Sequence, residues 1–436
     1  MTAAGADVIV VGAGSSGCVV AERLSRDPGR TVLVLEAGAG PPDEQSLRLG
    51  HLPIGAGSDR AVHYPSVQGF DLPRGRGVGG SSAVNGGYFV RWHQRDFDDW
   101  SAEYWSMPAI TGAYDRLDGG ATGGGLMNVS AFADDELHPN AVAFEKFWSA
   151  EGYARSPSPW PAEGIVRVRS NRDGRFRRSA AALLAPFLAE RPNLHLMTGS
   201  EVIDVRLRGG RAIGAVVGER LLSADEVILC AGTLGTAELL ARSDVLGSAQ
   251  CRVWEHRETL VRFASVGTGE PARSLLQTVL HTSDGLEIRC YNDDFATFID
   301  GLAPSTQSFG VALMHPDRSG SLRWDPVSRL RVDLGEISPG DAAKLDEWTE
   351  RVAGMLKMPM FAGLVEPGSA VVDSVVRTSQ HAWGTMPMGT ATDWLGAVDA
   401  VPGLRIADAS ILPTAGSSGP HATVMMVASH IADHIG

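Results

Sequence analysis

The sequence predicts an α/β fold, with α+β character overall, and three features of the chain support this prediction. The first forty residues contain two short apolar runs, DVIVVG and TVLVLE, which are typical of strands buried on both faces. Between them lies CVVAERLSRD, whose apolar residues have helical spacing, so the three runs form a βαβ unit. Residues 251–345 are instead typical of strands with alternating polar residues, joined by loops. We therefore expect a Rossmann-like nucleotide-binding domain and a second domain built on a mixed sheet.

The nucleotide-binding domain is predicted to be built from separated segments. Patterns typical of α/β structure occur at both ends and in the middle of the chain, where DEVILCAG indicates another buried strand. The 436 residues are also many for a single compact core. The expected division, with approximate limits, gives residues 1–100, 166–250 and 395–436 to the nucleotide-binding domain and residues 101–165 and 251–394 to the substrate-binding domain.

Composition and charge argue against several classes of protein. The net charge of −13 argues against nucleic acid or anionic lipid as the main partner. No window approaches about 20 uninterrupted apolar residues, so no transmembrane segment is expected. The short apolar stretch at the N-terminus runs straight into glycines and is not typical of a signal peptide. The four cysteines are widely spaced, which favours free thiols in a cytoplasmic protein and no metal site.

The loop after the first strand matches the dinucleotide-binding pattern GxGxxG. Gly12 permits the tight turn, Gly14 lets the backbone approach a pyrophosphate, and Gly17 lets the helix pack on the strand. Glu36 ends the second strand about 20 residues further on, where an acid accepts hydrogen bonds from ribose hydroxyls. The motif predicts a bound dinucleotide but does not separate FAD from NAD.

Four segments, in this order, resemble the glucose–methanol–choline (GMC) family of flavoprotein oxidoreductases. The dinucleotide loop with LVLEAG is the first, and GRGVGGSSAVNGGYFVR, similar to the family's first signature, is the second. The third joins NLHLMTGSEVIDVRL to EVILCAGTLGTAELL, and the fourth comprises HAWGTMPMGT, GLRIADASILP and PHATVMM. The resemblance implies bound FAD and an enzyme that oxidises an alcohol or a related CH–OH donor.

The same resemblance implies which residues are catalytic. His381, in H-x-x-G-T-x-x-M-G, falls at the family's catalytic histidine, and His421, in P-H-A-T-V-M-M, falls at its second catalytic position. A histidine suits the role of base because its pKa lies near working pH. We expect His381 to accept the hydroxyl proton and His421 to hydrogen-bond the developing alkoxide. The alternative is that the two histidines share both tasks.

The cofactor-binding residues are also implied by the resemblance. Glu36 is expected on the adenosine ribose, Val202 on the adenine through its backbone, and Asp408 near the phosphates. Val84 stands where some members attach flavin covalently to a histidine, so we expect non-covalent FAD. The full expected set is Gly12, Gly14, Ser15, Ser16, Gly17, Glu36, Ala37, Val78, Gly80, Ser81, Asn85, Gly86, Val202, Ala231, Asp408, Ala409 and Thr423.

The sequence leaves the electron donor and acceptor open. The short length and the Ala-, Gly- and Arg-rich composition resemble a bacterial subgroup linked to the redox cofactor mycofactocin. That resemblance implies mycofactocinol as the donor and a quinone or the respiratory chain as the acceptor, in a cytoplasmic enzyme or one bound to the inner face of the membrane. The alternatives are an alcohol oxidase that uses oxygen, a nicotinamide-dependent reductase, and a non-catalytic flavin-bound electron-transfer partner.

Three further features are interpreted from their patterns. Arg91 and the following WHQRDFDDW are predicted to form a folded, salt-bridged surface. His430 and His434 are interpreted as surface or packing residues. The segment RVWEH, which ends in His256, weakly resembles the family's N-L-Q-D-H segment, and the role of His256 stays open.

Overall fold

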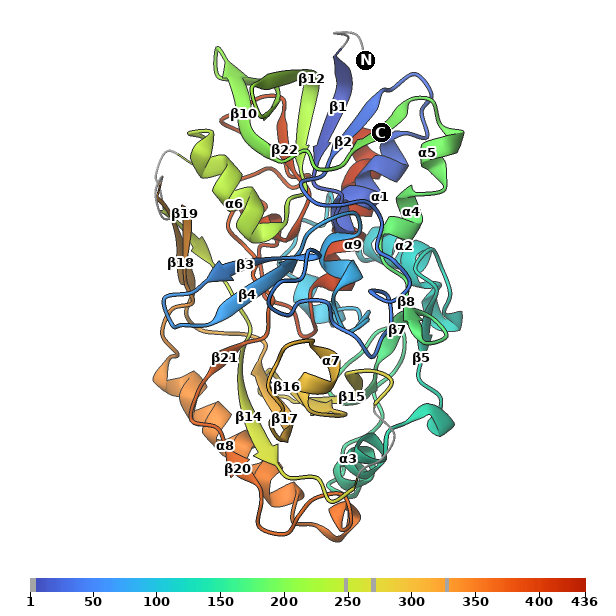
Figure 1. The fold of residues 1–436 in the computed structure, drawn as a ribbon, viewed down its shortest axis with the longest axis vertical. Coiled ribbons are helices and arrows are strands. Elements are labelled where there is room, and N and C mark those ends of the chain that lie inside the picture. The colour runs from blue at the N-terminus through green and yellow to red at the C-terminus, as the bar shows by residue number, and fades with distance from the viewer. Residues whose placement is uncertain (1–4, 247–249, 268–271, 326–328) are drawn as a thin grey trace.

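Two seven-stranded sheets organise the chain. The computed structural model describes residues 5–246, 250–267, 272–325 and 329–436. One sheet lies in the upper half of Figure 1 and the other in the lower half, and each is packed in a hydrophobic core of its own. The predicted α/β class is confirmed.

The first sheet has a parallel centre and an antiparallel flank. Across the sheet its strands are β10 (Val202–Arg208), β11 (Arg211–Val217), β12 (Arg220–Leu229), β1 (Ala6–Val11), β2 (Val32–Leu35) and β9 (Leu194–Met197), with β22 (Leu404–Ile406) also beside β12. The pairs among β22, β12, β1, β2 and β9 are parallel, whereas β10, β11 and the start of β12 pair antiparallel. Because β12 changes partner along its length, it joins the two parts into one sheet.

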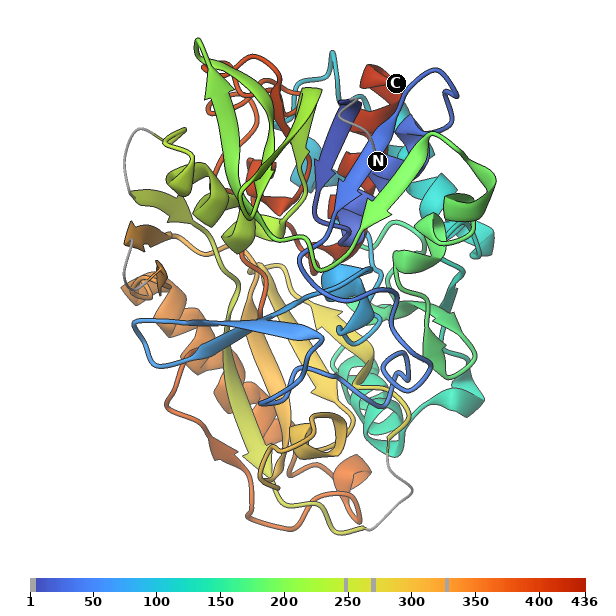
Figure 2. The same ribbon diagram turned by 45° about the horizontal axis from the view of Figure 1, so that its top comes forward.

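The helices α1 (Ser15–Leu24) and α9 (His421–Ile435) pack side by side against this sheet (Figures 1 and 2). Their contact buries apolar residues of both helices, among them Val20 and Met425. The C-terminal helix is therefore fixed beside the dinucleotide loop, although about 400 residues separate them in the chain. α2 (Met107–Asp118) packs on α9 and α4 (Ala181–Leu184) on α1, while α5 (Phe187–Glu190) lies beside β9 and α6 (Gly232–Arg242) beside β10.

The second sheet is antiparallel in every described pairing between its strands. The strands are, in order, β20 (Val371–Val372), β14 (Arg257–Phe263), β17 (Gln307–Leu313), β16 (Leu286–Tyr291), β15 (Leu276–His281) and β6 (Gly164–Arg167), with β21 (Arg377–Thr378) also on β14. The mixture of parallel and antiparallel pairs that was expected here lies in the first sheet instead. Apolar faces of α8 (Pro339–Met355) and α3 (Pro139–Ala150) cover this sheet.

Smaller elements connect the two sheets. A hairpin crosses the middle of the molecule in Figure 1, and two three-stranded sheets flank it. These elements are β3 (Ala61–Pro65) with β4 (Asp71–Gly75), β13 (Gln250–Val253) with β18 (Gly320–Asp325) and β19 (Arg329–Asp333), β5 (Val129–Ala131) with β7 (Arg169–Asp173) and β8 (Phe176–Arg177), and the short helix α7 (Phe295–Phe298). Within the described part of the chain, no helix combines the length and apolar character needed to cross a bilayer.

Arg91 is buried, which overturns the surface predicted for it. Its Nε and Nη2 donate to the carboxylate of Asp118 at 2.8 and 2.6 Å, and its guanidinium lies over the rings of Tyr114 and Trp160. Neither Arg91 nor Asp118 exposes its side chain to solvent. The prediction failed because the partner carboxylate lies on α2, 27 residues away, where no local pattern reveals it.

We predict that Asp118→Ala destabilises the protein by about 3–5 kcal/mol, because Arg91 and Arg169 both lose the buried carboxylate and only the half-exposed Asp115 remains to pair with Arg91. Denaturant unfolding measures this loss. The matched control is Glu163→Ala, which breaks the ion pair with Arg95 in which both side chains are about half exposed. That change should cost no more than about 1 kcal/mol. Equal losses for the two variants would contradict the assignment of Arg91 to a buried pair.

Candidate active site

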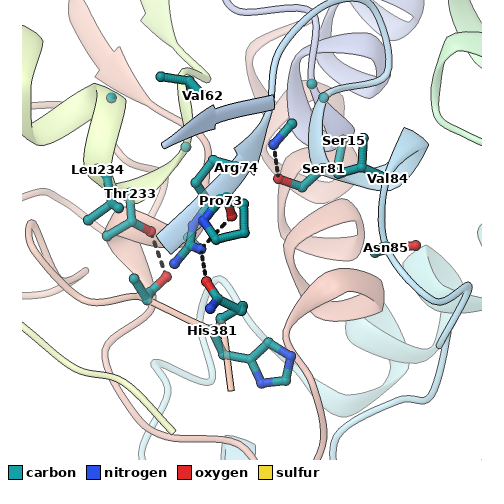
Figure 3. A pocket seen from close by; sticks show the side chains of 18 of the residues that line it. Ser15, Val62, Pro73, Arg74, Ser81, Val84, Asn85, Thr233, Leu234 and His381 are labelled. Atoms are coloured by element: carbon teal, nitrogen blue, oxygen red, sulfur yellow. Dashed lines mark hydrogen bonds between the residues drawn. The ribbon is translucent and has the colours of Figure 1, made fainter. Parts of the chain in front are cut away.

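A cavity of about 770 Å³ lies at the carboxyl ends of the central strands of the first sheet. It is lined by residues that directly follow β1, β2, β12 and β22, and its opposite wall comes from β14 and β16 of the second sheet. Open α/β sheets bind their ligands at this edge. Figure 3 shows Ser15, Ser81, Asn85 and His381 around the cavity.

The structure brings together most of the residues singled out from the sequence. The predicted residues that line this one cavity are His381, His421, Gly12, Gly14, Ser15, Ser16, Glu36, Ala37, Gly80, Ser81, Asn85, Gly86, Val202, Ala231, Asp408 and Ala409. They come from eight separate stretches of the chain, which are residues 12–16, 36–37, 80–86, 202, 231, 381, 408–409 and 421. Val84 also lines the cavity. The resemblance places it at the position where some family members attach flavin covalently to a histidine.

Three predicted cofactor residues lie outside the lining. Gly17 is packed behind the dinucleotide loop, where a Cβ would approach the carbonyl oxygen of Gly12 to 1.9 Å. Val78 is buried in the core of the first sheet. Thr423 is buried in the first turn of α9, between the lining residues His421 and Val424, and its hydroxyl bonds to Tyr114 at 2.6 Å. These residues support the cavity from behind.

The dinucleotide loop meets the Gly79–Gly80 turn through backbone alone. Gly79 N–H donates to the Ala13 carbonyl at 2.7 Å, and a Cβ on Gly80 would lie 2.7 Å from the Cα of Gly14. Gly12 has φ +98°, and a Cβ there would lie 2.6 Å from the carbonyl oxygen of Cys230. Because no side chain intrudes at this contact, the backbone can approach a diphosphate closely. The arrangement fits the pyrophosphate of a dinucleotide such as FAD.

Glu36 connects three segments that border the cavity. One carboxylate oxygen accepts from the N–H of Ala13 at 2.8 Å, and the other accepts from Gly38 at 2.8 Å and Gly77 at 2.9 Å. A carboxylate has about four acceptor positions, so one remains for a ligand hydroxyl. The side chain expected on the ribose is thus also a structural tie between the first βαβ unit and the turn that follows β4.

Asp408 makes a similar connection on the other side of the sheet. Its carboxylate accepts from the N–H of Gly232 at 2.9 Å, from the hydroxyl of Thr236 at 2.6 Å, and from the N–H of Ser410 at 2.9 Å. Burial raises the pKa of this carboxyl, and these hydrogen bonds oppose that shift. The residue fixes the start of α6 against the end of β22.

His381 is held at its backbone by buried polar groups. Its N–H donates to Oε1 of Glu255 at 2.6 Å, and the preceding Gln380 has φ +67°, a conformation rare for residues other than glycine. Arg74 of β4 donates to Oε1 of Gln380 at 2.8 Å (Figure 3). The ring of His381 bonds through Nδ1 to Nδ1 of His256 at 3.0 Å. Its Nε2 makes no hydrogen bond with the described residues and borders the cavity.

His421 is the first residue of α9, and its tautomer follows from Asn85. The Oδ1 of Asn85 accepts from the N–H of Gly87 at 3.0 Å, so its amide nitrogen must face His421. That nitrogen donates to Nδ1 of His421 at 3.2 Å. Neutral His421 therefore carries its proton on Nε2, which has no hydrogen-bond partner among the described residues. This N–H is a buried donor without a partner, on a residue that lines the cavity.

Both histidines are neutral at physiological pH. Burial and, to a smaller extent, the charge of Arg289 together lower the pKa of His381 to about 3, against an opposing effect of Glu287. Burial lowers the pKa of His421 to about 4, and the nearby Tyr88 carbonyl opposes this in part. A neutral imidazole can accept a proton or donate a hydrogen bond, as its tautomer allows.

The wall formed by the second sheet is a charged network that the sequence analysis missed. Arg289 donates to Glu287 at 2.7 Å and to Glu258 at 3.1 Å, while Tyr88 and Tyr291 donate to these carboxylates at 2.5 and 2.7 Å. Burial alone would raise the pKa of Glu287, but Arg289 lowers it below its ordinary value. The available signal was the pair Glu287 and Arg289, two residues apart on one face of a buried strand.

Comparison with known proteins identifies the family. The N-terminal model of the GMC oxidoreductases matches residues 6–257 and the C-terminal model matches residues 325–428. The chain belongs to the GMC oxidoreductase family. A GMC-type oxidoreductase in the thcA 5′ region of Rhodococcus erythropolis is 32% identical, with 97% of each chain covered.

Two further relatives have a named activity. Pyridoxine 4-oxidase of Microbacterium luteolum is 28% identical over 97% of this chain and 98% of its own. The crystal structure of pyridoxine 4-oxidase from Mesorbium loti superposes with a TM-score of 0.85 at 25% identity, and covers 98% of this chain and 99% of that one. The expected FAD cofactor and the expected enzyme class, an oxidoreductase of the CH–OH type, are thereby confirmed at the level of the family. FAD, rather than a nicotinamide, is the cofactor of this GMC chain.

We predict that the FAD-free protein loses stability as the pH falls from 6.5 to 5. A histidine in the unfolded chain has a pKa of about 6.5. In the folded protein the pKa values of His93, His381 and His421 are about 3, 3 and 4, so acid protonates these residues in the unfolded state first. Each such histidine then costs about 1.4 kcal/mol per pH unit in this window. Glu255, whose pKa burial raises to about 7, has the opposite sign and offsets one histidine.

Denaturant unfolding at a series of pH values checks this expectation. His421→Asn should remove one histidine's contribution and flatten the slope by about 1.4 kcal/mol per pH unit. A free energy of unfolding that is constant or increases between pH 6.5 and 5 would contradict the burial of neutral histidines.

Proposed function

We propose that this protein oxidises the CH–OH group of a small alcohol, with His381 as the base and His421 as the hydrogen-bond donor to the same oxygen. The observation that supports this most strongly is the pair of neutral imidazoles whose Nε2 atoms lack partners at one cavity. A Cβ placed on Gly419 would lie 3.4 Å from Nε2 of His381. The ring of His381 therefore lies close to the backbone of Gly419, two residues before His421. The named activity of the pyridoxine 4-oxidase relatives, which concerns an alcohol, supports the same class of donor.

The two histidines act on the same alcohol oxygen in different ways. The alcohol loses a proton from oxygen and a hydride from carbon. Nε2 of His381 takes the proton, while the Nε2–H of His421 donates to the oxygen as negative charge develops there. FAD, when bound, supplies the acceptor for the hydride and its electron pair. Burial strengthens the hydrogen bond to the developing oxyanion because no water competes for it.

The residues proposed to hold FAD are those expected from the sequence that line the cavity. The backbone of the dinucleotide loop and the Gly79–Gly80 turn would hold the pyrophosphate, the free acceptor position of Glu36 would hold the ribose, and Val202 would lie at the adenine. The FAD is proposed to be non-covalent, because Val84 has no nucleophilic atom to attach it.

The electron donor and acceptor of this protein are proposed from its resemblances. The resemblance to the mycofactocin-linked subgroup supports mycofactocinol as the donor and a quinone or the respiratory chain as the acceptor, in the cytoplasm or at the inner face of the membrane. The oxidase activity named for two relatives favours oxygen instead. Anaerobic bleaching of the flavin by a panel containing pyridoxine, aryl and aliphatic primary alcohols and mycofactocinol would identify the donor. Reoxidation by air or by a quinone would then identify the acceptor.

We predict that His381→Ala slows reduction of the bound flavin by about 10²–10⁴-fold, because it removes the general base. Stopped-flow absorbance under anaerobic conditions measures this rate with the best donor of the panel. FAD should stay bound, since the ring of His381 is not part of the proposed FAD-binding loops. The control His434→Ala, at the far end of α9, should reduce its flavin at the wild-type rate. Undiminished flavin reduction in His381→Ala would refute the proposed base.

A further inference from the structure

His256 is placed beside His381 by a short stretch of backbone pairing. Trp254 and Trp383 exchange both of their N–H···O hydrogen bonds at 3.0 Å, and the N–H of Ser379 donates to the carbonyl of His256 at 2.9 Å. The segment before β14 and the segment after β21 therefore run antiparallel, and the two histidines meet across them. The ring of His256 is buried and also packs against Trp383, with centroids 4.6 Å apart.

The contact between the two histidines has room for only one proton between their Nδ1 atoms. Their Nδ1 atoms lie 3.0 Å apart, with the rings edge to face at 87°. Two unprotonated nitrogens at this distance would oppose their lone pairs, and two protonated ones would oppose their hydrogens. One Nδ1 must therefore donate and the other must accept.

We propose that His256 is a positioning residue that holds His381 in the tautomer with its proton on Nδ1, leaving Nε2 free to accept the proton of the alcohol. This inference rests on the proposed function of His381 as the base. If His256 donated instead, His381 would carry its proton on Nε2 and could not accept another there. In the proposed arrangement His256 accepts at Nδ1 and carries its own proton on Nε2, a buried atom with no partner among the described residues.

The same contact also serves the protonated state. When Nε2 of His381 takes the substrate proton, the ring becomes a cation whose Nδ1–H still points at the lone pair of His256. A hydrogen bond from a charged donor is about twice as strong as one between neutral groups. His256 thus stabilises the charge that forms on the base, without any movement of either ring.

A neutral partner suits this site better than a carboxylate. A carboxylate against Nδ1 would raise the pKa of His381 and favour the protonated ring before any substrate arrives. A neutral imidazole avoids this and still accepts the hydrogen bond. Glu255 lies one residue away, yet its carboxylate binds the backbone N–H of His381 and not the ring. The ring of His381 is thus oriented by the neutral His256, while the carboxylate of Glu255 contacts only the backbone of His381.

The test compares His256→Leu with His256→Asn in the FAD-loaded protein. Leucine removes the acceptor, whereas the amide oxygen of asparagine can replace it. The first readout is the ¹⁵N chemical shift of the His381 ring nitrogens, assigned by loss of signals in His381→Gln, because a protonated and an unprotonated nitrogen differ clearly. The second is the anaerobic rate of flavin reduction. His430→Leu is the matched control, since it removes another buried histidine, which lies on α9.

We expect a protonated Nδ1 and an unprotonated Nε2 on His381 in the wild type and in His256→Asn. In His256→Leu we expect the proton to move to Nε2 in part or fully, and the rate of flavin reduction to fall about 10–100-fold, as for other groups that orient a functional histidine. His256→Asn should recover most of that rate, and His430→Leu should change neither readout.

Two results would overturn the inference. One is a wild-type His381 that carries its proton on Nε2, which also decides the question should His256→Leu fail to fold. The other is His256→Leu with an unchanged tautomer and rate. If His381→Ala itself reduces its flavin normally, the proposed function fails and not only the role of His256.

Discussion

Burial keeps the imidazoles of His381 and His421 neutral, and the rest of the site depends on this constraint. The first ring lies between the two sheets, and the second opens α9 beside the dinucleotide loop. The charge of Arg289 on the second sheet adds to the effect of burial at His381. The fold thus brings a potential proton acceptor and a potential hydrogen-bond donor to one cavity in the protonation states that alcohol oxidation needs.

The segments that border the cavity are joined by buried carboxylates and by backbone contact. Glu36 ties three backbone N–H groups together, Asp408 ties α6 to β22, and Glu255 holds the backbone of His381. Each of these acids follows or precedes a strand, where its side chain can reach a neighbouring segment. These contacts fix the segments of the chain that border the cavity relative to one another.

The sequence predicted the parts of the fold and site that depend on local spacing. Gly12, Gly14 and Glu36 are recognisable because a strand, a tight turn and a helix require those residue types at those intervals. Thr423 and Val78 were expected on the cofactor from the family resemblance, whereas in the structure neither lines the cavity. Arg91 was misread, and the Glu287–Arg289–Glu258 network was missed, because burial of a charge depends on partners from distant segments. The contact of His256 with His381 needs 125 residues to fold back, which no local pattern contains.

The pH dependence of anaerobic flavin reduction in the wild-type protein tests the account most directly. Burial, Arg289 and Arg74 lower the pKa of His381 and Glu287 raises it, with a net value of about 3. Glu255 and His256 also face this residue, through hydrogen bonds to its backbone N–H and to its ring. The account predicts a rate that is constant from pH 8 to about pH 5 and falls only at lower pH, as the base becomes protonated. A rate that falls with an apparent pKa at or above the ordinary histidine value of about 6.5 would contradict it.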